Sequence, residues 1–338
     1  MTRKYSVAVV GATGSVGSKI LQLLSEQDFP IKEIYAIGSK SSAIREVPFG
    51  YDMLTVQVID DVDFSSVDIS FFAVNDNVSK KYAPIVASKG SVVIDKSTYF
   101  RYDDQVPLVV PEANLSSMKA YSNKNIISNP NCCVIPLAVA LKPLDNLAKI
   151  KRLVISTYQS ASGVGKAGMQ ELYNNTKAKY TSSEVQPDVF PDQIAFNLFP
   201  CIGDFGADGY CDEETKISLE LQKIIGSHIK STVTCVRVPV FIGHCMSVNV
   251  EFKDKIDAKD AIEVLKESDG ISVISSKLKP YITSIDCVGK EEVFVSRIRN
   301  DLSCANSINL WITADNLFKG AALNAVQIAQ ELISEYLI

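Results

Sequence analysis

The segment YSVAVVGATGSVG, residues 5–17, decides the fold class because an apolar run passes directly into a glycine-rich turn. Its first six residues have the composition of a buried strand, and residues 15–26 carry apolar side chains at helical spacing. Gly11, Gly14 and Gly17 therefore lie between a strand and a helix, where glycines let a backbone approach a pyrophosphate. The pattern predicts a dinucleotide site, although glycines also gather in ordinary turns.

Strand-like and helix-like segments alternate along the rest of the first 130 residues. The expected strands cover residues 33–39, 55–59, 69–74, 91–95 and 125–128, and a further helix covers about 78–88. Strands that alternate with helices form a mostly parallel sheet with helices on both faces. We therefore predict an α/β protein with an N-terminal, Rossmann-like, doubly wound nucleotide-binding domain.

The residues after the second predicted strand indicate which dinucleotide binds. An NAD site usually carries an acidic residue there, which binds the ribose 2′-hydroxyl. This chain has hydroxyls and cations instead: Ser39, Lys40, Ser41, Ser42 and Arg45. These groups suit a 2′-phosphate and favour NADP over NAD, with a solvated loop as the alternative interpretation.

The composition argues against several classes of function. The 338 residues include 34 basic and 39 acidic side chains, and no basic run exceeds two residues, which disfavours nucleic-acid binding. No apolar segment approaches the roughly 20 residues that span a bilayer, and no signal-peptide pattern opens the sequence, so we expect a cytoplasmic protein. Eight cysteines without a C-x-x-C pair, and only two histidines, argue against a disulfide framework and a zinc site.

The segment NPNCC, residues 129–133, is the strongest candidate for chemistry. Asn-Pro-Asn is typical of a turn, and the apolar residues that follow predict a helix with Pro136 in its first turn. Cys132 is then at or next to a helix N-terminus, where unpaired N–H groups and the helix dipole favour a thiolate. Cys133 should face into packing. Two buried structural cysteines remain the alternative.

A nucleophilic thiol also needs a group that exchanges protons with it. His228 lies in an apparently exposed link after a helix, and we assign it no role. His244 follows a glycine between two predicted strands and is the best acid–base candidate, although it could be a buried structural histidine. A thiol, a histidine and a nicotinamide together indicate an aldehyde or acyl reaction through a thioester.

The second half of the chain predicts another α/β unit. The expected strands cover residues 152–159, 233–240, 247–252, 293–299 and 307–314, and the helices cover about 166–178, 213–226, 258–268 and 319–336. No linker rich in Pro, Gly or Ser and no internal repeat interrupts it. The boundary near residue 130 is inferred from the change of motifs.

With these residues identified, the sequence resembles the aspartate-semialdehyde dehydrogenase family over nearly its whole length. GATGSVG is similar to the nucleotide loop of that family, and NPNC to its nucleophile turn. Further matching segments follow in order: VVIDKSTYFR, VPLVVPEAN, STYQSASGVGKAGMQEL, IAFNLFP, DGYCDEETK, TCVRVPVFIGHCMSVNVEF and LNAVQIA.

The resemblance implies a homodimeric enzyme of lysine, threonine, methionine and diaminopimelate biosynthesis. It would convert L-aspartyl-4-phosphate to L-aspartate 4-semialdehyde and phosphate, oxidising NADPH and using no metal. It also implies an NADP-binding domain of residues 1–131 and 315–338, with the C-terminal helix packed back on it. Residues 132–314 would form an α/β catalytic and dimerisation domain.

The resemblance also assigns roles residue by residue. Cys132 would form the acyl-thioester, His244 would be the acid–base group, and Gln159 would orient the substrate. The substrate would contact Arg237 through its carboxylate, Glu213 through its amino group, and Arg101, Lys216 and Lys96 through its phosphate. The NADP contacts would be Gly11, Thr13, Gly14, Ser15, Val16, Gly17, Ser39, Ser41, Ser42, Ser162, Gly163 and Asn316.

Five residues depart from the usual pattern of the family. Ser41 replaces an arginine, for which Lys40 or Arg45 would have to compensate. Asn75-Asp76 replaces a Gly-Gly pair, and Asp76 should point away from a pyrophosphate or weaken its binding. Lys96 stands where Asn is usual, and Phe318 where Arg is frequent. These differences affect the expected cofactor more than the expected chemistry.

Two rival functions remain open from the sequence. A sister enzyme that reduces another acyl phosphate, such as N-acetyl-γ-glutamyl phosphate, would share the thiol and the nucleotide. A non-catalytic dinucleotide sensor would account for the altered residues.

For the enzyme we expect that Cys132→Ala abolishes turnover and that Cys133→Ala leaves most of it.

Overall fold

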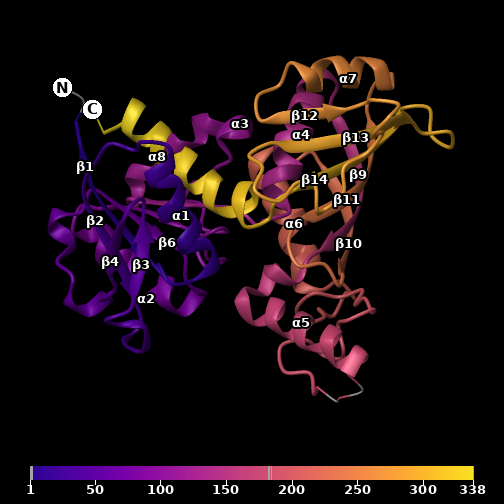
Figure 1. The fold of residues 1–338 in the computed structure, drawn as a ribbon. Helices are drawn as coiled ribbons and strands as arrows, with labels where there is room; N and C mark the ends of the chain where they lie inside the picture. The colour runs from indigo at the N-terminus through magenta and orange to yellow at the C-terminus, as the bar shows by residue number, and fades with distance from the viewer. Residues whose placement is uncertain (1–2, 182, 184, 338) are drawn as a thin grey trace. The chain divides into compact units, whose positions relative to one another are not determined.

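The computed structural model describes residues 3–181, 183 and 185–337 (Figure 1). The chain forms two compact units, each described here by itself. The first unit contains Met1–Asn131 and Ala321–Ile338, and the second contains Cys132–Gly320. Among the described helices, none has an apolar stretch long enough to cross a membrane.

The first unit contains a six-stranded sheet in the order β5-β2-β1-β6-β7-β8. Its strands are β1 (Tyr5–Val10), β2 (Ile31–Gly38), β5 (Gln57–Val58), β6 (Ile69–Phe72), β7 (Val92–Asp95) and β8 (Ile126–Ser128). Every neighbouring pair is parallel, which confirms the predicted sheet. The chain leaves β1 toward β2 and later returns to β6 on the other side of β1. The carboxyl ends of β1 and β6 therefore form a topological switch point, where such sheets bind ligands.

Helices cover both faces of this sheet. The helices are α1 (Ser15–Glu26), α2 (Asp76–Ser88), α3 (Pro111–Asn114) and α8 (Asn324–Glu335). Ala8 and Val10 pack with Ala83 and Val86 of α2 on one face. Side chains alternate along a strand, so Val9 points to the opposite face, where α1 and α8 contact each other (Figure 1).

The C-terminal helix belongs to the first unit, as predicted. Gln330 donates a hydrogen bond to Gln27 of the α1 C-terminus at 3.0 Å, and Asn324 donates to the Asn129 side-chain oxygen at 2.7 Å. Helical structure begins before α8, because the preceding residues Phe318–Leu323 form a wider, π-helical turn. The predicted helix at 319–336 therefore consists of this turn followed by α8.

The strand predicted at residues 55–59 is wrong in extent. Thr55 ends β4 (Asp52–Thr55), which pairs with β3 (Glu46–Phe49) in a small hairpin that the sequence analysis missed. Only Gln57 and Val58 pair with β2. The run is divided because the Val56 N–H donates to the Arg45 carbonyl instead of to the large sheet.

The second unit contains a mixed sheet in the order β10-β9-β11-β14-β13-β12. Its strands are β9 (Ile150–Gln159), β10 (Lys230–Arg237), β11 (His244–Phe252), β12 (Ile271–Ile274), β13 (Val293–Asn300) and β14 (Ser307–Ala314). The short β12 was not predicted. The strand expected at 233–240 ends at Arg237, because Pro239 lacks the N–H that pairing requires.

Three helices of the second unit cover one face of this sheet, and a fourth lies apart. They are α4 (Val134–Leu147), α6 (Asp212–Ile224) and α7 (Ala258–Lys266), with α5 (Lys166–Thr181) the separate one (Figure 1). Leu153 and Ile155 of β9 are fully buried, whereas Val154, Ser156 and Tyr158 alternate with them and are exposed or half-buried. The sheet therefore has one covered face and one open face.

Four strand ends meet at one edge of the second sheet. β9 and β10 are parallel, and Gln159 is paired with Arg237 at their carboxyl ends. β11 runs antiparallel to β9, so its first residue, His244, lies at the same edge. β14 is antiparallel to β11 and ends there at Ala314, the partner of His244. The topology thus brings Gln159, Arg237 and His244 together, although Gln159 and His244 are 85 positions apart in the sequence.

A buried carboxylate joins three segments of the second unit. Asp145, in the last turn of α4, accepts hydrogen bonds from His228 at 2.8 Å, from Lys149 at 2.8 Å and from the Ile150 N–H at 3.0 Å. Burial alone raises the pKa of Asp145, but these donors outweigh burial and hold the pKa below its ordinary value. His228 therefore has a structural partner, and the expectation that it lies in an exposed link without a role is wrong.

Asp145→Asn should lower the free energy of unfolding at neutral pH by about 2 kcal/mol, because hydrogen bonds to a charged acceptor contribute about 1.5–3 kcal/mol. The folded pKa is depressed, so this stabilisation is present above the unfolded pKa of about 4 and is lost as the pH falls through the folded value. Urea unfolding at neutral pH and at about pH 2, well below the unfolded pKa, measures both effects. A gap between wild type and variant that does not shrink on acidification would contradict this account.

Candidate active site

Cys132 and His244 form a thiol–imidazole pair in the second unit. The Cys132 Sγ lies 3.4 Å from the His244 Nε2. Cys132 is partly exposed and lies two residues before the start of α4, whereas His244 is fully buried. The N-cap position is occupied by Cys133, so neither asparagine of the turn caps the helix. The predicted nucleophile and the predicted acid–base group are therefore in hydrogen-bonding contact.

The surroundings of Cys132 favour its thiolate. A hydrogen bond from the Cys133 thiol is the largest influence, and the nearby His244 ring and Arg237 guanidinium act in the same direction against burial. The pKa of Cys132 therefore lies well below its ordinary value. Burial raises the pKa of Cys133, so this neighbour stays a thiol and a donor. The two sulfurs and a His244 ring nitrogen lie within 4.8 Å of one another. Cys133 is buried, as expected, but it is more than a packing residue.

Gln159 and Glu213 are linked at the same edge of the sheet. The Gln159 Nε2 donates to the Glu213 Oε1 at 3.0 Å, and the Thr157 hydroxyl donates to the Gln159 Oε1 at 2.9 Å. These two bonds fix which end of the amide carries oxygen. Glu213 lies in the first turn of α6, where acidic side chains suit the helix dipole.

Glu214, which the sequence analysis missed, positions Glu213. One of its carboxylate oxygens accepts from the Cys211 N–H at 2.8 Å, and the other accepts from the Cys235 N–H of β10 at 2.9 Å. The start of α6 is thereby attached to β10. The sequence signal was the spacing from Cys211 to Glu214, which matches a capping box with cysteine in the cap position.

Arg237 is a buried cation at the end of β10. Only 5% of it is exposed, and its Nη1 donates to the Ser160 carbonyl at 2.7 Å. Burial lowers its pKa, while the negative charges of Cys132 and Glu213 oppose that shift. A Cβ at Gly163 would lie 2.6 Å from the Arg237 Nη1. Gly163, predicted as a cofactor contact, thus leaves room for the guanidinium.

Ser162 and Asn316, also predicted as cofactor contacts, are 2% exposed each. The Asn316 Oδ1 accepts from the Gly243 N–H at 2.9 Å, and the Asn316 Nδ2 donates to the Ser162 Oγ at 2.9 Å. Ser160 lies between this pair and the imidazole, with its N–H donating to the His244 Nδ1 at 3.1 Å. Ser160 therefore contacts the histidine at Nδ1, and Ser162 and Asn316 contact Ser160. The sequence analysis missed Ser160, whose only signal was its position directly after the Gln159 strand end.

A separate pocket of about 500 Å³ lies at the switch point of the first unit. Gly11, Thr13 and Gly14 line it from the β1–α1 turn, and Asn75 lines it from the β6–α2 turn. Gly11 has a φ of +87°, and a Cβ there would lie 2.4 Å from the Ala73 carbonyl oxygen. A Cβ at Gly17 would lie 2.2 Å from the Gly11 carbonyl oxygen, so close helix–strand packing needs this glycine too. Ser15 and Val16 form the first turn of α1, whose N-cap is Gly14.

The residues that follow β2 form another side of this pocket. Ser39, Lys40 and Ser42 line it, and the Ser39 Oγ lies 2.8 Å from the exposed Ser41 Oγ. Asp76 points elsewhere, as expected, because its carboxylate accepts from the Thr98 N–H at 2.8 Å.

Asp60 and Tyr82 are among the lining residues that were not predicted as cofactor contacts. Their side chains hydrogen-bond to each other at 2.9 Å. Asp60 follows a strand that the sequence analysis misplaced, which explains why it was missed.

The predicted phosphate-binding cations are divided between the units. Arg101 and Lys96 belong to the first unit, where the Arg101 Nη2 donates to the Lys96 carbonyl at 2.6 Å. Arg101 is buried and Lys96 is half-buried. Lys216 belongs to the second unit and lies half-buried on α6, one turn after Glu213.

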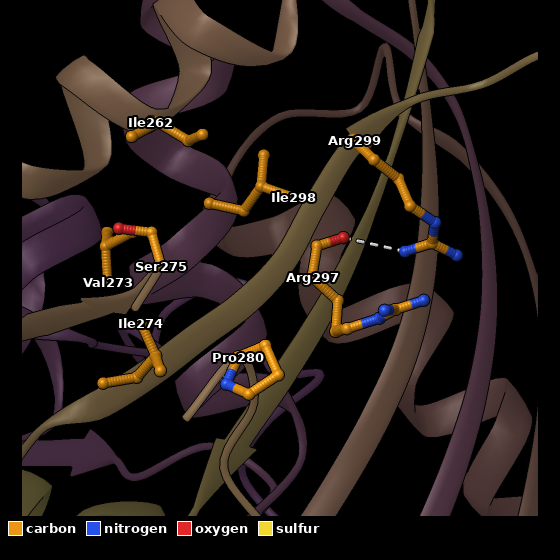
Figure 2. Close-up of a pocket in the computed structure, with 8 residues that line it drawn as sticks. All are labelled: Ile262, Val273, Ile274, Ser275, Pro280, Arg297, Ile298 and Arg299. Carbon is orange, nitrogen blue, oxygen red and sulfur yellow. Dashed lines mark hydrogen bonds between the residues drawn. The ribbon is translucent and has the colours of Figure 1, made fainter. Parts of the chain in front are cut away.

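The second unit also has a pocket of about 280 Å³ among α7, β12 and β13 (Figure 2). Its lining is mostly apolar, with Ile262, Val273 and Ile298 among the side chains. The Arg299 guanidinium donates to the Arg297 carbonyl at 2.7 Å. The lining includes no cysteine, histidine or carboxylate. We therefore place the chemistry at Cys132.

The influence of Cys133 on Cys132 predicts a pH profile. Iodoacetamide alkylates the thiolate, so modification of Cys132 should already approach its plateau near neutral pH. Cys133→Ala removes the donor and should move the half-maximal pH upward by about one unit, a factor of ten in thiolate fraction at low pH. Cys133→Ser keeps a donor and should restore most of the profile. Peptide mass spectrometry follows Cys132 alone, and coincident profiles for wild type and Cys133→Ala would refute the assigned hydrogen bond.

Comparison with known proteins agrees with these features. Two family models match the chain: the semialdehyde dehydrogenase NAD binding domain over residues 6–121 and the semialdehyde dehydrogenase dimerisation domain over residues 141–319. Among similar sequences, the aspartate-semialdehyde dehydrogenase of Rickettsia bellii is 59% identical and that of Rickettsia typhi is 60% identical, and each alignment covers 100% of both chains.

Solved structures give the same result. The aspartate semialdehyde dehydrogenase II of Vibrio cholerae, crystallised in complex with ASA, superposes with a TM-score of 0.97 at 42% identity. This match covers 99% of the present chain and 100% of the other. A probable aspartate-semialdehyde dehydrogenase from Pseudomonas aeruginosa gives 0.94 at 33% identity over 99% and 100%. The chain therefore belongs to the aspartate-semialdehyde dehydrogenase family.

Proposed function

We propose that this protein converts L-aspartyl-4-phosphate to L-aspartate 4-semialdehyde and phosphate, with NADPH as reductant, through an acyl-thioester on Cys132. The observation that carries the proposal is the 3.4 Å contact between the Cys132 sulfur and the His244 ring. A partly exposed thiol whose pKa is lowered is a competent nucleophile near neutral pH. The pathway would be the biosynthesis of lysine, threonine, methionine and diaminopimelate.

Two opposite charges near the thiol favour an amino-acid substrate. Arg237 presents a guanidinium, which suits the α-carboxylate in a two-pronged arrangement. Glu213 presents a carboxylate for the α-amino group, and its hydrogen bond from Gln159 holds it in place. The Vibrio cholerae relative was crystallised with ASA, which supports the same substrate class here.

The pocket of the first unit fits a dinucleotide. Gly11 and Gly17 bring backbone close to backbone, and the first turn of α1 contains no acidic side chain that would repel a pyrophosphate. Backbone groups from Gly11 to Gly17, including Thr13, Ser15 and Val16, would hold the pyrophosphate. Ser39, Ser41, Ser42 and Lys40 would hold the 2′-phosphate. NADPH supplies a hydride when bound.

The residues of the chain supply the remaining chemistry. The Cys132 thiolate attacks the acyl-phosphate carbonyl, and N–H groups near the start of α4 stabilise the oxyanion. The departing phosphate would be bound by cations, for which the family resemblance implies Arg101, Lys96 and Lys216. His244 then gives a proton to the oxygen of the reduced, sulfur-bound carbon and takes it back from that hydroxyl as the C–S bond breaks, so that the aldehyde departs and the thiolate is restored. Gln159 orients the substrate beside Glu213.

The open face of the second sheet suits a homodimer. Apolar and polar side chains are mixed on this face, with Val154, Tyr158, Val236 and Trp311 among the apolar ones. The sheet of a second protomer could pack face to face against it. The matching family model is described as a dimerisation domain. In this proposal residues 132–314 catalyse and dimerise, and residues 1–131 with 315–338 bind NADP.

A cytoplasmic location is part of the proposal. All eight cysteines are free in the structure, including five buried ones. A reactive thiol beside a second thiol persists in a reducing compartment.

The rival functions differ in what they require of the site. An N-acetylated substrate carries no amino cation for Glu213 to bind. A non-catalytic sensor has no need of a low-pKa thiol against a buried imidazole. The presence of both Arg237 and Glu213 in the site and the contact between Cys132 and His244 therefore favour the aspartyl enzyme over both.

The assay is the reverse reaction, with aspartate semialdehyde, phosphate and NADP, followed by the rise of NADPH absorbance. Wild type should turn over, and Cys132→Ala should lose essentially all activity. His244→Asn should slow kcat by about 10²- to 10⁴-fold, the usual range for an acid–base group, while the dissociation constant for NADP stays unchanged. A fully active Cys132→Ala enzyme, or no wild-type turnover with either NADP or NAD, would refute the proposal.

Glu213→Gln tests the substrate class. Loss of the carboxylate should reduce kcat/KM for aspartate semialdehyde by about 10- to 100-fold, because a charged hydrogen bond contributes about 1.5–3 kcal/mol. The N-acetyl-γ-glutamyl analogue should be a poor substrate for both proteins. Glu112→Gln, on α3 of the first unit, is the matched control. A preference of wild type for the acetylated semialdehyde would select the rival enzyme.

A further inference from the structure

The His244 ring has two partners from one residue at its inner nitrogen. The Ser160 N–H and the Ser160 Oγ both lie 3.1 Å from the His244 Nδ1. A backbone N–H can only donate, so this contact matches a lone pair on Nδ1. The ring hydrogen is then on Nε2, which faces the Cys132 Sγ. A hydroxyl can donate or accept, so the Oγ can also match a ring that carries hydrogen on Nδ1.

For the Ser160 Oγ to accept from the ring, its own hydrogen must point elsewhere. The Asn316 Oδ1 lies 3.1 Å from the Ser160 Oγ and offers that place. The orientation of the amide is fixed, because the Gly243 N–H donates to Oδ1 at 2.9 Å. The Ser162 Oγ is within hydrogen-bonding distance of both amide atoms, 3.1 Å from Oδ1 and 2.9 Å from Nδ2. Ser162 in turn lies 3.0 Å from the Ser160 Oγ.

Burial gives these contacts their importance. Ser160 and His244 are fully buried, and Ser162 and Asn316 are 2% exposed. A ring in such a place depends on protein groups for its hydrogen bonds. The neighbouring ionisable groups include Cys132 and Cys133, whose sulfurs lie within 4.8 Å of a ring nitrogen, and Arg237 at the end of β10. Of these, Cys132 contacts the ring directly, and Arg237 contacts the Ser160 carbonyl.

We infer that Ser160 is a positioning residue that serves both protonation states of His244, and that Asn316 and Ser162 hold its hydroxyl in the accepting orientation. This inference rests on the proposed function, in which His244 gives and takes a proton at Nε2. It assigns Asn316 and Ser162 to the histidine instead of the nucleotide.

The need for the hydroxyl follows from the proton count. A ring with hydrogen only on Nε2 cannot release it to a substrate oxygen without becoming an imidazolate. A ring with hydrogens on both nitrogens can release the Nε2 hydrogen and remain neutral, with the Nδ1–H bonded to the Ser160 Oγ. In the opposite direction the neutral ring accepts the proton back at Nε2. The backbone N–H of Ser160 can bond only to an Nδ1 that carries no hydrogen. A neutral ring in that state holds its hydrogen on Nε2 and cannot release it in this exchange.

The test measures the ring directly by nitrogen NMR of protein labelled with ¹⁵N-histidine. The chain has two histidines, so His228→Asn assigns both sets of signals. In Ser160→Ala, the pH at which His244 carries both hydrogens should fall by about one unit, a tenfold loss of that state at a given pH. Asn316→Ala should shift it in the same direction. Ser160→Thr should restore the wild-type titration, and Ser70→Ala, a buried serine of the first unit, should not move it.

Kinetics separates this role from nucleotide binding. Ser160→Ala and Asn316→Ala should each lower kcat by about 10- to 100-fold, within the range of an impaired acid–base group, and leave the KM for NADP within about twofold. The double variant should be little worse than Ser160→Ala, because both changes act through one hydroxyl. This non-additivity keeps the test decisive if Ser160→Thr does not fold.

Three outcomes would overturn the inference. They are an unchanged ¹⁵N titration in Ser160→Ala, a raised KM for NADP with unchanged kcat in Asn316→Ala, and additive effects in the double variant. The NMR result does not depend on turnover. An inactive wild-type protein with the expected titration would therefore refute the proposed reaction alone.

Discussion

The second unit is arranged around the cost of keeping a negative sulfur partly out of water. An isolated thiolate in such a place would be protonated, so its neighbours must compensate. Cys133 donates a hydrogen bond, Arg237 contributes a permanent charge, and His244 contributes a ring nitrogen at 3.4 Å. Cys133 is the next residue in the chain, but Arg237 and His244 are more than 100 positions away from Cys132 in the sequence. The end of β10, the start of β11 and the start of α4 bring them together.

The compensation is itself built on a second layer of buried polar contacts. Arg237 is held by the Ser160 carbonyl, and His244 by the Ser160 N–H, so one peptide segment positions both side chains. Gly163 leaves the space that the guanidinium fills. Glu214 attaches the start of α6 to β10 and thereby places Glu213. Because buried polar groups must be paired, a change in this layer is transmitted to the reacting atoms.

Much of the fold could be predicted from local pattern. The first strand and helix were predicted with the observed bounds, and the parallel order followed from their alternation. Errors came where a segment is shared or short. The run around Val56 is divided between a hairpin and the large sheet, and β12 is a four-residue edge strand without alternation in burial. Pairing partners decide such segments, and those partners are distant in sequence.

The candidate site was divided in the same way. The sequence by itself determined the residues with unusual chemistry: a cysteine beside a turn, a histidine after a glycine, an arginine in an apolar strand and glycines between strand and helix. Only the tertiary structure decided that Ser160, Asn316 and Cys133 act on the reacting pair, and that His228 clamps Asp145. Serine, asparagine and buried cysteine occur throughout protein sequences, so the presence of these residue types does not indicate a functional site. Their role comes from distance and burial, which exist only once the strands have met.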